Sequence, residues 1–158
     1  MIEVRAGTPA DVPFVFAGVR ALAEFEGLTH LLEGTEEQLH EHLFGARPSC
    51  EILVGSVDGE DSGYALFFTS YSTFLTKPGL FLEDLFVVPE RRGAGLGRAL
   101  LSALAALAVE RGCGRLEWSV LDWNKKAIGF YESLGAEPVR GWIPYRLAGE
   151  ALAGFRRR

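Results

Sequence analysis

The N-terminal part of the chain carries the pattern of one strand followed by two helices. Residues 2–6 alternate between apolar and polar side chains, which predicts a short strand. Residues 8–11 combine a capping threonine, a proline and an aspartate, and apolar residues then recur every three or four positions. This pattern predicts a helix that ends near Glu26–Gly27. A second capping pattern at 35–38 predicts a short helix that ends at about Phe44.

The middle of the chain predicts three strands. Residues 51–57 and 63–71 are rich in β-forming side chains and are joined by a polar turn, so they predict a hairpin. Residues 80–88 form a third, strongly apolar run, which Pro89 ends. The acidic pair at 83–84 interrupts this run.

A long helix and another strand follow. From about Gly95, leucines recur on one helical face, and Gly112 is a suitable stop for the helix. Residues 115–121 predict the next strand. Because parallel strands joined by a helix almost always cross over right-handedly, segment 80–121 predicts a right-handed parallel strand–helix–strand unit.

The C-terminal part predicts one more helix and further strands. Asp122 or Asn124 can cap a helix that runs to Leu134. Residues 138–147 have the pattern of one or two strands. Taken with the preceding elements, this order predicts a mixed α/β domain.

Composition limits the possible functions without choosing one. The chain has 158 residues, which predicts a single domain over 1–158. Its net charge of −5 argues against nucleic acid as a partner and permits a cationic one. We expect no membrane segment, because no apolar run is long enough. Cys50 and Cys113 do not indicate a disulfide framework, so a cytoplasmic location is expected, and the three histidines show no metal-binding spacing.

Residues 91–98, Arg-Arg-Gly-Ala-Gly-Leu-Gly-Arg, lie between the third strand and the long helix. Glycines let the backbone approach a ligand closely, and a helix N-terminus offers unpaired N–H groups and a positive dipole end. The arginines add charge. The segment therefore predicts a site for a phosphate or diphosphate, with a glycine-rich turn that binds nothing as the alternative.

Two nucleotide-binding loops fit this segment poorly. A dinucleotide-binding loop needs a third glycine where this chain has Arg98, although Glu117 stands about 20 residues on, where a ribose-binding acid is expected. A Walker A loop needs Gly-Lys followed by Ser or Thr, which the segment lacks. The spacing that fits is Arg-x-x-Gly-x-Gly, formed by Arg92, Gly95 and Gly97.

This spacing resembles the acyl-CoA-binding motif of the GNAT family of N-acetyltransferases, and the resemblance covers nearly the whole chain. The branch that it resembles contains spermidine/spermine N1-acetyltransferase and thialysine Nε-acetyltransferase. Besides the glycine loop, the segments that carry the resemblance are Leu22–Glu26, Tyr71–Thr73, Leu82–Asp84, Val120–Asn124, Phe130–Tyr131 and Leu134–Ala136.

The resemblance implies the GNAT fold, in which a mixed central sheet has helices on both faces and strands that splay apart at the acetyl-CoA site. It also implies acetyl-CoA as the cosubstrate, no metal, and direct transfer of the acetyl group to a primary amine in a ternary complex. The thioester and the pantetheine arm would lie along residues 85–87, and the diphosphate at the glycine loop. The residues so assigned to acetyl-CoA are Leu85, Phe86, Val87, Arg92, Gly93, Ala94, Gly95, Leu96, Gly97, Arg98, Asn124 and Ala127.

Catalytic roles follow from the same resemblance. It makes Glu83 the base that accepts the ammonium proton, directly or through water, and Tyr131 the acid that protonates the sulfur of coenzyme A. The residues that it places around the amine are Phe25, Glu26, Glu83, Asp84 and Trp142. Taken without the resemblance, the acidic pair indicates an edge-strand salt bridge and Tyr131 a core tyrosine.

The acceptor amine stays open at this stage. The resemblance implies a small cationic amine and a homodimer, but residues 136–140 are shorter and less acidic than the corresponding loop of the relatives. Arg140 in this loop would repel a long polycation. A thialysine- or lysine-like amino acid, a diamine, a polyamine, an antibiotic and a protein all remain open as acceptors. The alternatives to an enzyme of this class are a non-catalytic acyl-CoA sensor and a nucleotide-binding enzyme that uses the same loop.

Overall fold

The computed structural model describes residues 1–156 of the chain, which form two compact units. The first unit is Met1–Ser119 and the second begins at Val120, and each is described by itself below. The prediction of a single domain over 1–158 stays a prediction. The elements are β1 (Ile2–Ala6), α1 (Val12–Glu26), α2 (Glu36–Phe44), β2 (Glu51–Val57), β3 (Glu60–Ser72), β4 (Lys77–Val87), α3 (Leu96–Glu110), β5 (Leu116–Trp118), α4 (Lys125–Ser133) and α5 (Gly149–Phe155).

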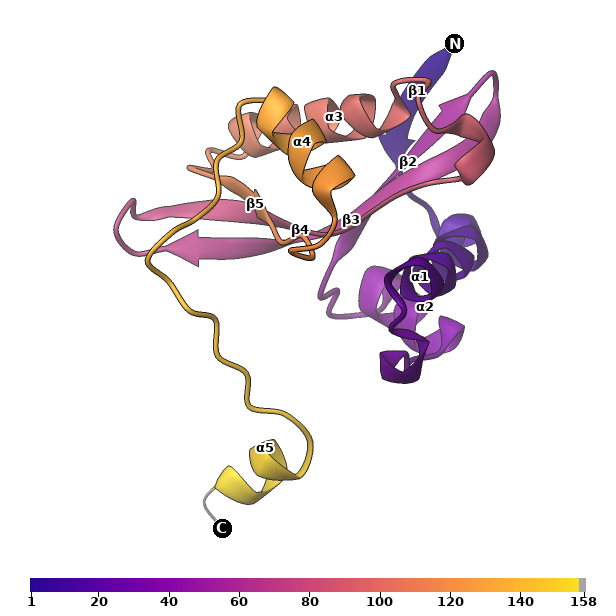
Figure 1. The fold of residues 1–158 in the computed structure, drawn as a ribbon. Helices are drawn as coiled ribbons and strands as arrows, with labels where there is room; N and C mark the ends of the chain where they lie inside the picture. Colours follow the sequence, from indigo (N-terminus) through magenta and orange to yellow (C-terminus); the bar gives the residue numbers. More distant parts are fainter. Residues whose placement is uncertain (157–158) are drawn as a thin grey trace. The chain divides into compact units, whose positions relative to one another are not determined.

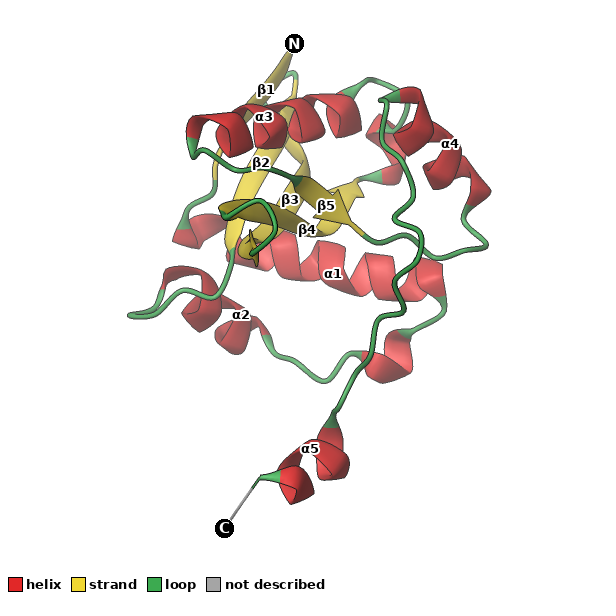
Figure 2. Cartoon of the chain, turned by 90° about the vertical axis from the view of Figure 1, so that its left-hand side faces the viewer, coloured by secondary structure: helices red, strands yellow, loops and turns green. Residues whose placement is uncertain are grey.

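The strands of the first unit form a mixed sheet in the order β1-β2-β3-β4-β5 (Figure 2). Neighbours from β1 to β4 are antiparallel, and β5 pairs parallel to β4. The parallel strand–helix–strand unit predicted over 80–121 is therefore confirmed. β2 has the predicted bounds, and β3 extends beyond its predicted range at both ends. β4 starts three residues before the predicted 80–88 and ends one residue earlier, and β5 is much shorter than the predicted 115–121.

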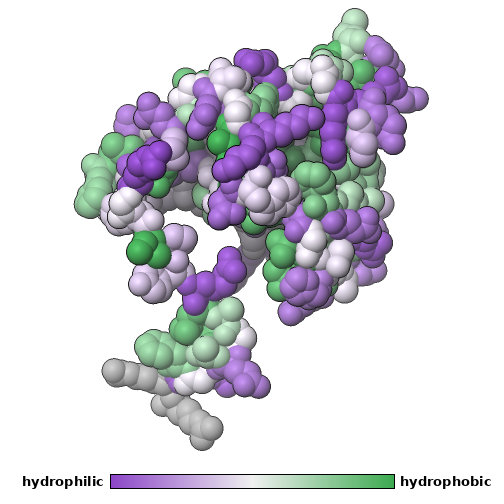
Figure 3. All heavy atoms as spheres, in the orientation of Figure 1, coloured by the Kyte–Doolittle hydropathy of each residue, from purple (hydrophilic) through white to green (hydrophobic). Residues whose placement is uncertain are grey.

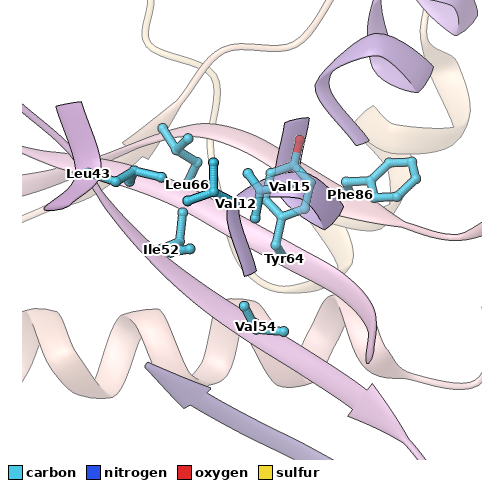
Figure 4. Packing of buried hydrophobic residues seen from close by; sticks show 8 residues of the cluster. All are labelled: Val12, Val15, Leu43, Ile52, Val54, Tyr64, Leu66 and Phe86. Carbon is cyan, nitrogen blue, oxygen red and sulfur yellow. The ribbon is translucent and has the colours of Figure 1, made fainter. Parts of the chain in front are cut away.

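Helices cover both faces of this sheet. Figure 1 shows α3 along one face and α1 with α2 on the other. Between the sheet and α1 with α2 lies a buried cluster, part of which is drawn in Figure 4: Val12, Val15, Leu43, Ile52, Val54, Tyr64, Leu66 and Phe86. On the other face, α3 buries its leucine stripe, as the periodicity predicted. The predicted α/β fold class is confirmed.

Local hydrogen bonds explain where the first two helices begin. The Thr8 backbone N–H and hydroxyl donate to Asp11 at 2.7 and 3.0 Å, and Arg5 donates to the same carboxylate at 2.8 Å. One turn of 3-10 helix precedes α1 for this reason. At α2, the Thr35 hydroxyl accepts from Gln38 N–H while the Gln38 side chain accepts from Thr35 N–H, which confirms the predicted capping box.

The start of α3 packs closely on the sheet because two strand positions lack side chains. A methyl group added at Gly55 of β2 would run into Leu96, the first residue of α3. One added at Gly63 of β3 would overlap the Phe86 carbonyl and also press against Leu96. Leu96 is almost fully buried there. The glycine loop that precedes α3 is thereby held at one end of the sheet, beside the end of β4.

β4 has two irregularities near its end. In its pairing with β3, Leu66 lies opposite Asp84 and Phe67 opposite Leu82, so Glu83 is the extra residue of a β-bulge. Its pairing with β5 ends at Leu82, although β4 itself continues to Val87. The two strands therefore part where the resemblance implies a splay.

The second unit corrects one prediction. α4 begins after Asn124, whose side chain caps it, and ends at Ser133, close to the predicted end. Residues 138–147 were predicted as one or two strands, but the structure has them as irregular chain (Figure 2). A strand needs a neighbouring strand for its backbone hydrogen bonds, and the pattern of side chains alone does not supply one. The short helix α5 was not predicted.

None of the helices within residues 1–156 is long and apolar enough to cross a membrane.

Candidate active site

The glycine loop makes a backbone turn that ends in the first turn of α3. Gly93 and Gly95 have φ angles of 81° and 96°, in the left-handed region that favours glycine. Gly95 caps α3, and the first bond of the helix runs from Ala99 N–H to the Gly95 carbonyl. The N–H groups of 96–98 precede that bond and have no acceptor within the helix, so they are available to an anion such as a diphosphate. The predicted loop residues Arg92 to Arg98 thus lie together, with Leu96 offering its backbone only.

Arg92 is fixed at the end of β4. Its Nε donates to the Val87 carbonyl at 3.1 Å, and its guanidinium lies 5.9 Å from the centre of the Phe25 ring. This cation–π contact links the predicted cofactor loop to a residue predicted for the amine site. Arg91, whose charge was also expected to favour an anion at the loop, pairs with Glu60 at 2.9 Å.

Residues 85–87 of β4 have one paired edge and one open edge. They pair with Ala65, Tyr64 and Gly63 of β3 on one side. Within the part of the chain that the structure describes, β5 does not reach them on the other side. An extended, amide-rich arm such as pantetheine can add to an edge of this kind in the manner of a strand.

The bulge at Glu83 decides which way the acidic pair points. Directly opposed residues of an antiparallel pair lie on the same face of a sheet, so Asp84 shares the face of Leu66, which packs toward α1. Without the bulge, Asp84 would lie on the same face as Leu82, which pairs with Phe67. Glu83 is exposed, whereas Asp84 is partly buried.

Asp84 has an unusual electrostatic setting. Burial, together with the nearby charges of Glu83 and Glu26, raises the pKa of Asp84 to about 6. A hydrogen bond from the Tyr64 hydroxyl, at 3.5 Å, acts in the opposite direction. Burial also raises the pKa of Glu26. Three carboxyl groups therefore gather at the end of α1 and the end of β4, where a bound cation would be stabilised.

Phe25 lies beside this group at the end of α1 and is half exposed. The structure thus brings together Phe25, Glu26, Glu83 and Asp84, the predicted amine-site residues of the first unit.

The other predicted site residues belong to the second unit. There, the Asn124 side chain accepts from Ala127 N–H at 3.2 Å, and the Tyr131 ring packs against Phe130. Trp142 lies in the irregular segment that follows α4.

Two features of this face were not predicted. Tyr64 is fully buried and reaches Asp84, but in the sequence it is one more apolar-like residue of a strand. A cavity of about 650 Å³ opens nearby, lined in part by Leu43, Phe44, Cys50, Ile52 and Phe68. Burial and the charges of Asp84, Glu51 and Glu83 raise the pKa of the Cys50 thiol. No motif marks residues that meet only through the fold.

Comparison with known proteins identifies the class. The acetyltransferase (GNAT) family matches residues 20–136. The chain is 36% identical to the thialysine N-epsilon-acetyltransferase of Mus musculus, over 95% of this chain and 94% of that protein. It is 34% identical to an L-ornithine N5-acetyltransferase of Arabidopsis thaliana, over 95% of this chain and 86% of that protein.

Solved structures agree on the fold. An integron cassette protein from the mobile metagenome of V. cholerae superimposes with a TM-score of 0.78 at 23% identity, over 97% of this chain and 96% of that one. A probable acetyltransferase superimposes with a TM-score of 0.79 at 23% identity, over 92% and 97% of the two chains.

The chain belongs to the GNAT acetyltransferase family. It is an N-acetyltransferase of the EC 2.3.1 class, and the family implies acetyl-CoA as its cosubstrate. The loop before α3 and the open edge of β4 fit the two parts of that cosubstrate, its diphosphate and its amide-rich arm. The nucleotide-binding and sensor alternatives are therefore set aside. Among residues 1–156, no group of His, Cys, Asp and Glu could hold a metal ion.

Proposed function

We propose that this enzyme acetylates the primary amine of a small cationic molecule, with a lysine-like or ornithine-like amino acid as the preferred acceptor. The observation that carries the proposal is the group of Glu26, Glu83 and Asp84 beside the open edge of β4. Close carboxylates in a partly buried place favour a cation. Relatives named for thialysine and ornithine, both short amino acids, support this choice of acceptor.

The cofactor side of the mechanism uses mainly backbone groups. The N–H groups at the start of α3 hold the diphosphate, and Arg98 adds charge there. The open edge of β4 at 85–87 binds the pantetheine amides, and one N–H of this edge stabilises the oxyanion that forms on the carbonyl. Acetyl-CoA supplies the thioester when it is bound.

The acceptor side of the mechanism uses side chains. Glu83 takes a proton from the acceptor ammonium group and, being exposed, passes it to water. The free amine nitrogen then attacks the thioester carbon, and the bond from that carbon to sulfur breaks. Tyr131 gives its phenolic proton to the departing sulfur. Asp84 and Glu26 hold the ammonium group by charge, and Phe25 lies beside it.

The length of the acceptor is limited by charge. A polyamine carries further cationic groups, and Arg140 lies in the segment after α4. A short amino acid carries a carboxylate instead, which a cationic side chain attracts. We therefore propose that lysine-like acceptors react faster than spermidine.

We also propose a homodimer in the cytoplasm. Residues 138–147 have a strand pattern but no strand partner within residues 1–156, and apolar side chains gather over α5 (Figure 3). The exposed apolar residues of this C-terminal segment include Val139, Trp142, Ile143, Tyr145, Leu147, Leu152 and Phe155. An exposed apolar area of this kind marks an interaction surface, and we assign it to a second copy of this chain. Sedimentation velocity should give twice the chain mass, and Ile143→Glu should shift the protein toward monomer; a monomeric wild type would reject the dimer.

The test of the function is release of free thiol from acetyl-CoA with a panel of amines. The panel contains thialysine, lysine, ornithine, putrescine and spermidine, and we expect the first three to give the highest kcat/KM. Tyr131→Phe should lower kcat about 100-fold or more with little change in affinity for the cosubstrate. Binding of acetyl-CoA with no turnover on any amine would contradict the proposed activity. A preference for spermidine would contradict the proposed lysine-like or ornithine-like acceptor.

A further inference from the structure

Tyr64 occupies a fixed position under α1. Its side chain is fully buried and lies beside the Phe86 ring (Figure 4), with the two ring centres 5.6 Å apart. The centre of the Phe14 ring is 6.4 Å away, in an edge contact. Gly18 of α1 lies directly against the ring, and a methyl group added at Gly18 would overlap it. Contacts with α1 at Gly18 and with Phe86 of β4 hold the ring in one orientation. The position of its hydroxyl group is therefore also fixed.

The hydroxyl group of Tyr64 reaches the carboxylate of Asp84. The two oxygens lie 3.5 Å apart, and a buried hydroxyl needs a partner because it has lost water. Burial and the charge of Asp84 raise the pKa of Tyr64 far above its usual range. The phenol therefore keeps its proton at every pH of interest and acts as a donor to the carboxylate. A donor of this kind stabilises the ionised form of the acid.

The other groups that face Asp84 act against its ionisation. Glu83 comes from β4 itself and Glu26 from the end of α1, and both are acidic. Cys50, just before β2, is also near enough for the charge of Asp84 to affect its thiol. The phenol from β3 is thus the group in this set that favours the charged carboxylate.

We propose that Tyr64 is a positioning residue of the acceptor site, which holds the carboxylate of Asp84 ionised and aimed at the acceptor's ammonium group. This inference rests on the proposed function, since it needs a cationic acceptor. It goes further in assigning a role to a residue that no sequence motif marks. It also gives the two neighbouring acids different roles. Glu83 is exposed at the bulge, whereas Asp84 accepts a hydrogen bond from the buried hydroxyl of Tyr64.

The test is the pH dependence of kcat/KM for the amine in Tyr64→Phe, which removes one oxygen and keeps the ring. Without the donor, the protonated acid is relatively more stable, so the low-pH limb should move upward by about half a pH unit or more. KM for the amine at neutral pH should rise about 5-fold, and KM for acetyl-CoA should not change. Tyr71→Phe is the matched control, since it removes the same oxygen from an exposed tyrosine of the same strand.

Asp84→Asn completes the test and covers the case in which Tyr64→Phe folds poorly. Asp84→Asn should remove the low-pH limb of the kcat/KM profile, because the group that titrates there is gone. Adding Tyr64→Phe to Asp84→Asn should then change KM for the amine no further. The inference would be overturned if the low-pH limb of kcat/KM stays in place in Tyr64→Phe. It would also be overturned if the effects of the two substitutions on KM for the amine multiply in the double variant. Both results require a wild type that acetylates amines, so a wild type without turnover would reject the proposed function instead.

Discussion

The two faces of the sheet in the first unit are built in different ways. On the face of α3, Gly55 and Gly63 bring the helix close to the strands, and what is offered to a ligand is the backbone of the loop and the helix start. On the face of α1 and α2, polar side chains are partly or fully buried: Tyr64, Asp84 and Cys50. The first face is shaped by missing side chains, and the second by the chemistry of those present.

This difference fits the two substrates. A cosubstrate of constant structure can be bound by main-chain groups, whose positions depend on a few glycines. An acceptor whose identity varies among relatives needs side chains, which can change without disturbing the fold. We therefore expect substitutions on the two faces to affect different kinetic constants, and the following predictions test that separation.

The largest effect is expected for Glu83→Gln. The change removes the proposed base and keeps the size of the side chain, so kcat should fall about 100-fold, with KM for acetyl-CoA unchanged. The pH–rate profile should change as well as the rate. Steady-state kinetics from pH 5.5 to 9.5 measures both, and a profile of unaltered shape would show that another group accepts the proton.

A smaller effect, on KM for acetyl-CoA, is expected for Gly95→Val. Gly95 has a φ of 96°, where a β-branched residue is strained, so the loop must rearrange. KM for acetyl-CoA should rise about 10-fold, while KM for the amine stays within about 2-fold of wild type. Gly129→Val, in a helix where an added side chain meets nothing, is a control for the general cost of this replacement. Equal increases in both KM values would contradict the separation of the faces.

The smallest effect is expected for Asp11→Asn, which should alter stability and leave both KM values alone. The hydrogen bonds from Arg5 lower the pKa of Asp11 to about 2. A carboxyl with a lowered pKa stabilises the fold above its unfolded pKa of about 4, and this contribution is lost as the pH falls toward 2. Because Arg5 is half exposed, the loss on substitution should be about 1 kcal/mol.

Urea unfolding at pH 7 and at pH 3 measures this contribution. The difference in free energy of unfolding between wild type and Asp11→Asn should shrink at pH 3. A difference that is the same at both pH values would show that the charge of Asp11 does not stabilise the fold.

The elements of the α3 face could be predicted from the sequence, except for the length of β5. These elements are encoded locally: the leucine stripe of α3, the glycine loop, and the strands on either side of them. The starts of α1 and α2 were predictable for the same reason, because a capping residue and its partner stand three positions apart.

The α1 face could be predicted only in part. Strict alternation along β4 places Asp84 on the same face as Leu82, and the bulge at Glu83 breaks that alternation. Whether a bulge forms depends on the register with β3, which no single strand encodes. The contact of Tyr64 with Asp84 likewise joins two strands 20 residues apart and has no signal in either.

The C-terminal segment shows the limit of pattern-based prediction. Residues 138–147 alternate as a strand would, yet the structure has them as irregular chain. The pattern describes the side chains, but the strand depends on a partner for its backbone. By contrast, α4 makes its own hydrogen bonds and was predicted nearly to its last residue.

A crystal structure of the ternary complex with coenzyme A and lysine or thialysine would test the separation of the two faces most directly. We predict the diphosphate at the N–H groups that begin α3, and the acceptor nitrogen on the α1 face within hydrogen-bond distance of Asp84 or Glu83. A coenzyme lodged away from the glycine loop, or an acceptor nitrogen distant from both carboxylates, would contradict the account.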